Sequence, residues 1–162
     1  PLMRNYNVIS HNILMIMNFG IYFIFYYYFL DQSLYKRIAW FILGAFVLAL
    51  IINPFLMNFF LESQLYAYIT GAIMVVILAI MYLLELLYSD RISNIKTDFV
   101  FWISIGVLVF YVGYIPIKLT RHYLSSEFDY MRTLFQVQLL LVIIMNICIC
   151  IGYTWGKKRP QF

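Results

Sequence analysis

The chain has 162 residues, of which 65% are hydrophobic and 11% are charged, and its formal net charge is +4. A soluble domain carries about 25% charged residues and about half apolar ones, so this composition excludes an ordinary soluble domain. The charged residues cluster between long apolar runs. The basic excess therefore indicates orientation in a membrane rather than binding to nucleic acid.

Five apolar segments each exceed the roughly 18 residues that a membrane-spanning helix needs. At about 1.5 Å per residue, each can cross a hydrocarbon core about 30 Å thick. The segments lack the alternating pattern of a membrane β-barrel. The sequence therefore predicts an all-α, polytopic transmembrane helical bundle that forms a single transmembrane domain over 1–162, with helices at about 12–30, 38–60, 66–88, 99–117 and 133–155.

Lysine and arginine in the short loops predict the orientation, because they are enriched on the cytoplasmic side. One side of the predicted bundle holds Lys36, Arg37, Arg91, Lys96, Lys157, Lys158 and Arg159, whereas the other holds Arg4, Lys118, Arg121 and Arg132. We therefore expect a bacterial inner-membrane protein in which this chain begins outside and ends in the cytoplasm. Because the chain begins at Pro1 without a methionine, we also expect N-terminal residues of the full protein to be absent from it.

Glu85 is the one carboxylate within a predicted span. It lies one turn from the cytoplasmic end, so we expect its side chain to extend to the interface or to pair with Arg91 or Lys96. The alternative is a proton or cation relay, because ionisable groups within membranes are often functional.

Asn53 and Pro54 interrupt the second predicted helix, and the proline predicts a kink there. Broken helices line some transport sites, although they also occur in ordinary bundles. Asn146 is the deepest amide, and we expect it to face the bundle interior. Asn53, Glu85 and Asn146 thus form a possible intramembrane polar site. The remaining amides are predicted to hydrogen-bond between helices; they are Asn12, Asn18, Asn58, Gln136 and Gln138.

Two histidines, His11 and His122, fall on the predicted outer face together with Glu62, Glu127 and Asp129. Imidazole and carboxylate groups suit zinc, but these residues come from separate regions without ligand spacing. We interpret them as solvated loop residues, with His11 and His122 as weak metal candidates. Cys148 and Cys150 point to nearly opposite sides of a helix, so buried thiols are favoured over a disulfide.

Catalytic motifs are missing from the sequence, including GxSxG, HExxH, the P-loop and GxGxxG. Serines and histidines are too few to suggest a nucleophile and its base. No paired histidines lie mid-membrane to hold haem. We therefore predict a non-enzymatic protein with no cofactor.

The fourth predicted helix is the most distinctive segment. Trp102 lies one turn inside it, at the depth of an aromatic belt. Gly106 and Gly113 share one face and offer a groove to a neighbouring helix. Pro116 is expected to bend or end the helix near the outer surface. These residues predict a helix that packs against a neighbour or a partner.

Three segments resemble a family of uncharacterised multi-pass inner-membrane proteins from Bacteroidota: "NYNVISHNILMIMNFGIYFIFYYYF", "FVFWISIGVLVFYVGYIPI" and "IGYTWGKKR". The resemblance implies a protein of about seven helices, with about two further helices before this chain. Some members are encoded near sensor histidine kinases, which implies a link to signalling. The family has no catalytic residues to carry over to this sequence.

These observations predict an accessory or sensing subunit that contacts a membrane-protein partner, or a second copy, within the bilayer. The alternative is a small transporter or channel that uses the kink at Asn53 and Pro54 with the mid-membrane polar residues.

Overall fold

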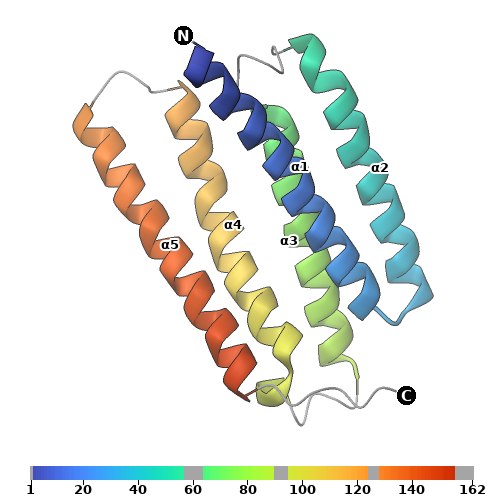
Figure 1. Ribbon diagram of the computed structural model, residues 1–162. Helices are drawn as coiled ribbons and strands as arrows, with labels where there is room; N and C mark the ends of the chain where they lie inside the picture. The colour runs from blue at the N-terminus through green and yellow to red at the C-terminus, as the bar shows by residue number, and fades with distance from the viewer. Residues whose placement is uncertain (1, 57–63, 90–94, 124–127, 156–162) are drawn as a thin grey trace. The chain divides into compact units, whose positions relative to one another are not determined.

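The computed structural model describes residues 2–56, 64–89, 95–123 and 128–155, which form five α-helices and no strand (Figure 1). The helices are α1 (Leu2–Phe29), α2 (Ser33–Leu56), α3 (Leu65–Leu87), α4 (Phe99–Tyr123) and α5 (Phe128–Trp155). Each is long and apolar enough to cross a membrane. The predicted fold class is confirmed: the chain is an all-α, multi-pass integral membrane protein.

Three helices begin before their predicted starts. α1 begins at Leu2 and α5 at Phe128, although the parts apolar enough to span begin at Val8 and Met131. Hydropathy locates the part of a helix that crosses lipid, whereas backbone hydrogen bonds continue the helix into the interface. α2 also begins earlier than predicted, at Ser33, and the end predicted for it at residue 60 lies outside the described residues.

α4 continues through Pro116 to Tyr123, six residues beyond the end predicted at 117. A proline inside a helix removes one amide donor, here the one that would bond the carbonyl of Val112. Because the turns on both sides keep their own bonds, the helix does not end there. Pro116 is exposed, so its ring lies away from the protein interior.

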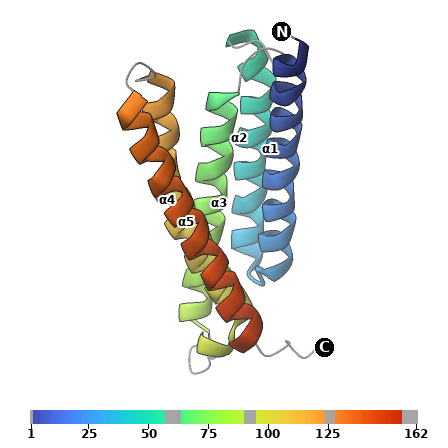
Figure 2. The same ribbon diagram turned by 60° about the vertical axis from the view of Figure 1, so that its left-hand side comes forward.

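The chain divides into two compact units, Pro1–Leu78 and Ala79–Phe162, with the boundary inside α3. In the first unit, α1 and α2 run antiparallel and are joined by residues 30–32 (Figures 1 and 2). Phe19 of α1 is fully buried in this unit. Its ring makes edge contacts with Phe46 of α2 and Tyr68 of α3, with centroids 5.6 and 5.4 Å away. Aromatic rings therefore join all three helices of the unit.

In the second unit, α4 and α5 form an antiparallel pair (Figure 2). The end of α3 is tied to the start of α4 through Asp98. One oxygen of Asp98, Oδ1, accepts hydrogen bonds from the Tyr82 hydroxyl at 2.8 Å and from the Phe101 backbone N–H at 3.0 Å. Asp98 thus caps the α4 N-terminus, where a negative charge is favourable.

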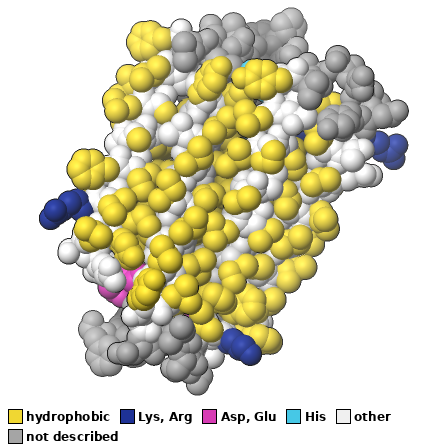
Figure 3. Space-filling view, turned by 180° about the vertical axis from the view of Figure 1, so that it is seen from behind, with side chains coloured by type: hydrophobic (Ala, Val, Ile, Leu, Met, Phe, Trp, Pro, Cys, Tyr) yellow, Lys and Arg dark blue, Asp and Glu magenta, His cyan; other side chains and the backbone are white. Residues whose placement is uncertain are grey.

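The outward faces of the helices are apolar. Figure 3 shows one face of the molecule covered largely by hydrophobic side chains, with lysine and arginine side chains near its edges. Phe55 is 86% exposed and Phe41 is 75% exposed. Such exposure would be costly in water but suits contact with lipid tails.

Candidate functional site

Three glycines line the α4–α5 interface: Gly106 and Gly113 on α4, and Gly152 on α5. A Cβ atom added at Gly106 would lie 2.9 Å from the Cys148 Cβ and 3.1 Å from the Met145 carbonyl oxygen. One added at Gly113 would lie 2.8 Å from Leu141 Cδ1. No larger residue fits at either glycine without movement, because the α5 backbone lies close to Gly106 and the Leu141 side chain fills the space at Gly113. The groove predicted on this face is therefore filled by α5 of the same chain.

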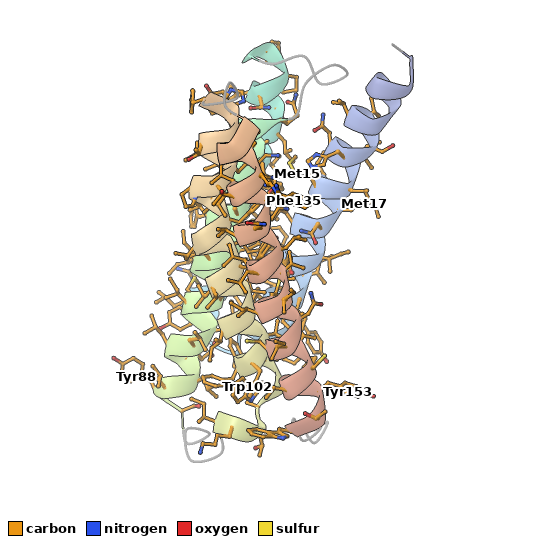
Figure 4. The ribbon with its side chains drawn as sticks, turned by 90° about the vertical axis from the view of Figure 1, so that its left-hand side faces the viewer. Met15, Met17, Tyr88, Trp102, Phe135 and Tyr153 are labelled. Carbon is orange, nitrogen blue, oxygen red and sulfur yellow. The ribbon has the colours of Figure 1, made fainter. Side chains whose placement is uncertain are left out.

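Trp102 contacts α5 at the end of the interface where α4 begins and α5 ends. Its indole Nε1–H donates to the Lys96 carbonyl oxygen at 2.9 Å, and its ring lies edge-on to Trp155 at a centroid distance of 6.0 Å. Gly152 of α5 is buried against the start of α4. A Cβ atom added at Gly152 would lie 3.0 Å from the Trp102 Cβ and 3.1 Å from the Phe99 carbonyl oxygen. Figure 4 shows Trp102 beside α5. Trp102 thus makes contacts within its own chain, and the partner contact proposed for it stays a prediction.

Arg121 joins α4 to α5 near the opposite end of the pair. Its Nη1–H donates to Gln138 Oε1 at 2.6 Å, and its guanidinium lies over the Phe135 ring, 5.9 Å from the centroid. Within the described residues, Arg121 makes no ion pair and its buried Nη2 has no hydrogen-bond partner. Sequence reasoning placed Arg121 in a loop, because the helix was predicted to end before it.

Three buried amides meet in the first unit, where α2 ends and α3 begins. Asn53 Nδ2–H donates to Gln64 Oε1, and the Gln64 backbone N–H donates to Asn12 Oδ1 at 3.3 Å. Asn12 is fully buried, and Asn53 and Gln64 are each 2% exposed. Asn53 Oδ1 has no hydrogen-bond partner within the described residues. We call Asn12, Asn53 and Gln64 the amide cluster; Asn12 of α1 bonds a distant segment, as predicted, but its partner Gln64 precedes α3 rather than lying in a helix.

Gln64 is the member of the amide cluster that sequence reasoning missed. It stands just before α3, in a segment read as a loop. The sequence does indicate that Gln64 could be buried: it directly precedes a long apolar run, so its side chain can lie inside the bundle next to that run.

Glu85 of α3 is buried, with 5% of its surface exposed. The side chain therefore does not reach the surface, and of the two predicted outcomes the pairing with Arg91 or Lys96 stays a prediction. Half of the spanning part of α3 is buried, so a side chain one turn from the helix end still faces protein. Of its two predicted partners, Arg91 lies outside the described residues.

Asn146 lies on the exposed side of α5, which corrects the prediction that it faces the bundle interior. Its Nδ2–H donates to the Val142 carbonyl oxygen at 2.8 Å, one turn earlier on the same helix. The residues of α5 that face α4 are instead Leu141, Met145 and Cys148. At 100° per residue, Asn146 falls away from that face. Depth alone does not determine which way a side chain points.

The remaining candidates do not come together. His11 and His122 are both exposed, on α1 and α4. Within the described residues, no three His, Cys, Asp or Glu side chains could jointly hold a metal ion. The carboxylates Glu62 and Glu127 lie outside the described residues, and the side chain of Asp129 is not described. Cys148 is half-buried and Cys150 is exposed, so the prediction of two buried thiols was wrong for Cys150.

In comparisons with known proteins, no family model matches this chain, and neither a curated protein nor a solved structure matches it.

Proposed function

We propose that this chain is a non-enzymatic subunit of a bacterial inner-membrane assembly, with an accessory or sensing role exerted through helix contacts inside the bilayer. The observation that carries the proposal is the exposed amide of Asn146. An amide facing hydrocarbon is costly unless a partner supplies hydrogen bonds. Asparagine side chains stabilise contacts between membrane helices by forming such bonds.

The shortness of the segments between helices supports contacts within the membrane rather than outside it. Residues 30–32 separate α1 from α2, 57–64 separate α2 from α3, 88–98 separate α3 from α4, and 124–127 separate α4 from α5. Such segments offer little surface to a soluble partner, whereas the helices expose long apolar faces. The distribution of lysine and arginine supports an orientation with the start of this chain outside and its end in the cytoplasm.

Photo-crosslinking in native membranes tests this proposal. A photoreactive phenylalanine analogue replaces Ile143, which is 55% exposed on the side of α5 that carries Asn146. The expected result is a covalent adduct with a protein. The matched control places the analogue at Leu141, which faces Gly113 of α4 and should react within the chain. Adducts with lipid alone at position 143 would refute the proposal.

A second candidate function, a small transporter or channel, is favoured by the amide cluster. Buried amides beside a proline-containing helix end resemble the polar, interrupted helices that bind substrates in transporters. The test measures proton and Na⁺ flux into proteoliposomes that contain the purified chain. Flux that Asn53→Leu abolishes would support transport, whereas flux no greater than in empty vesicles would exclude these two ions as substrates.

A further inference from the structure

The outward face of α5 carries a seven-residue repeat. Six exposed positions follow one another at alternating intervals of three and four residues: Gln136, Leu139, Ile143, Asn146, Cys150 and Tyr153. We call these residues the α5 seam. A mean interval of 3.5 residues is the spacing that keeps side chains in one line between two packed helices.

The α5 seam lies opposite the face that packs on α4. Leu141 and Cys148 contact the glycines of α4, and at 100° per residue Ile143 and Cys150 point roughly the other way. Figure 4 shows Tyr153 extending outward from α5, and 81% of its surface is exposed. α5 therefore has one face for α4 and an exposed second face, on which Asn146 is the polar side chain nearest the middle of the span.

Asn146 lies near the middle of the membrane-spanning part of α5. The spanning part of α5 is Met131–Trp155, so Asn146 lies about 4.5 Å from its midpoint at 1.5 Å per residue. Its Nδ2 bonds to Val142, and its Oδ1 makes no hydrogen bond within the described residues. An amide carries both donors and acceptors, so a second asparagine is its chemical complement.

Symmetry brings two such amides together. Copies of this chain inserted in the same orientation place their α5 helices parallel, related by a two-fold axis along the membrane normal. At such an axis each residue meets its own counterpart. Self-pairing suits an amide and apolar side chains but not a charge, and no seam residue is charged. An asparagine in a seam of this spacing also sets the register of two-stranded helix pairs.

We propose that this chain forms a two-fold dimer through the α5 seam, with the two Asn146 amides hydrogen-bonded to each other near the bilayer centre. The proposal rests on the proposed function and names a second copy of the chain as the partner. Leu139 and Ile143 pack around the amide pair. Cys150 lies one turn further along and faces its counterpart across the axis.

Cys150 supplies the test, because the chain has only two cysteines. The variant Cys148→Ser keeps Cys150 alone, and membranes that contain it are treated with a mild oxidant. We expect a disulfide-linked species at twice the 19.4 kDa mass of the chain. The matched control Cys150→Ser keeps only Cys148, which faces Gly106 of α4 and should stay monomeric.

Variants at Asn146 test the amide pair in the Cys148→Ser background. Asn146→Leu should reduce the cross-linked fraction about threefold, the loss expected for one interhelical amide contact. Asn146→Gln keeps an amide and should retain most of it. An equal yield with Asn146→Leu would overturn the role given to Asn146.

Two further outcomes separate the dimer from the proposed function. A photo-adduct from Ile143 that contains a different protein, with no disulfide dimer at Cys150, overturns the dimer but keeps the subunit role. Adducts with lipid alone at Ile143, with no disulfide at Cys150, overturn both proposals.

Discussion

The two units of the chain pack their helices by opposite means. In Ala79–Phe162, α4 and α5 are in contact at Gly106, where the α5 backbone lies close, and at Gly113, where the Leu141 side chain fills the space that the glycine leaves. In Pro1–Leu78, the space between helices is filled by the Phe19 ring and its aromatic neighbours, and the amide cluster adds hydrogen bonds. The α4–α5 contact thus depends on small residues at its closest approach, whereas the first unit depends on large aromatic and polar side chains.

This difference follows from packing in lipid. Burying apolar surface adds little there, because lipid tails are as apolar as the side chains. Helices must gain stability from close fit, from aromatic contacts or from hydrogen bonds. The two units show that one chain can use all three, and substitutions should therefore affect them differently.

The largest effect should come from Gly106→Leu, which breaks the α4–α5 fit. The new side chain would collide with the Met145 backbone as well as Cys148, so the helices must separate, and we expect a loss of about 3 kcal/mol in unfolding free energy. Denaturant titration in mixed micelles, followed by circular dichroism, measures this loss. Gly44→Leu is the matched control, because nothing lies within 4 Å of a Cβ added at Gly44. Equal losses for the two variants would contradict the proposed fit.

Gly71→Ala probes the aromatic packing of the first unit. The added Cβ would lie 2.5 Å from the ring of the fully buried Phe19, so the ring must move and lose its contacts, at a cost of about 2 kcal/mol. The same titration measures it. Gly20→Ala on α1 meets nothing within 4 Å, and it should instead stabilise the protein by about 0.5 kcal/mol. If Gly71→Ala also stabilised it, Phe19 would not fill that space.

Asp98→Ala should lower the unfolding free energy by about 1.5 kcal/mol, because it removes the α4 cap and the acceptor for Tyr82. Asp98→Asn keeps an oxygen for both donors and should recover most of the loss. Hydrogen exchange at the Phe101 amide reports the cap directly. Unchanged protection of that amide in Asp98→Ala would show that the cap does not form.

The smallest effect should come from the amide cluster. A double-mutant cycle with Asn53→Leu and Gln64→Leu should give a coupling of about 0.6 kcal/mol, which is typical of hydrogen bonds between membrane helices. Asn146→Leu serves as the comparison, because that amide bonds within its own helix, and it should show no coupling to Gln64→Leu. Zero coupling between Asn53 and Gln64 would show that their hydrogen bond does not stabilise this unit.

The fold could be predicted from the sequence because five long apolar runs leave few alternatives. Side-chain direction could not be predicted in the same way. Glu85 and Asn146 lie in similar apolar surroundings, yet the first is buried and the second exposed. Depth follows from position in a run, whereas direction depends on which neighbour covers each face. The glycine groove was predicted at Gly106 and Gly113, but α5 as its occupant was not, because spacing on one helix says nothing about the other.

The tryptophan contact of α4 and α5 gives the protein an internal optical probe. Trp102 and Trp155 lie with ring centroids 6.0 Å apart, and the third tryptophan, Trp40, belongs to α2. In Trp40→Phe, all tryptophan emission would originate at the end of the α4–α5 pair. Two indoles at that separation exchange excitation, so the anisotropy of the emission should rise when the two helices part. Opening of this helix pair, by a substitution or by a bound partner, could then be followed in a native membrane without any added label.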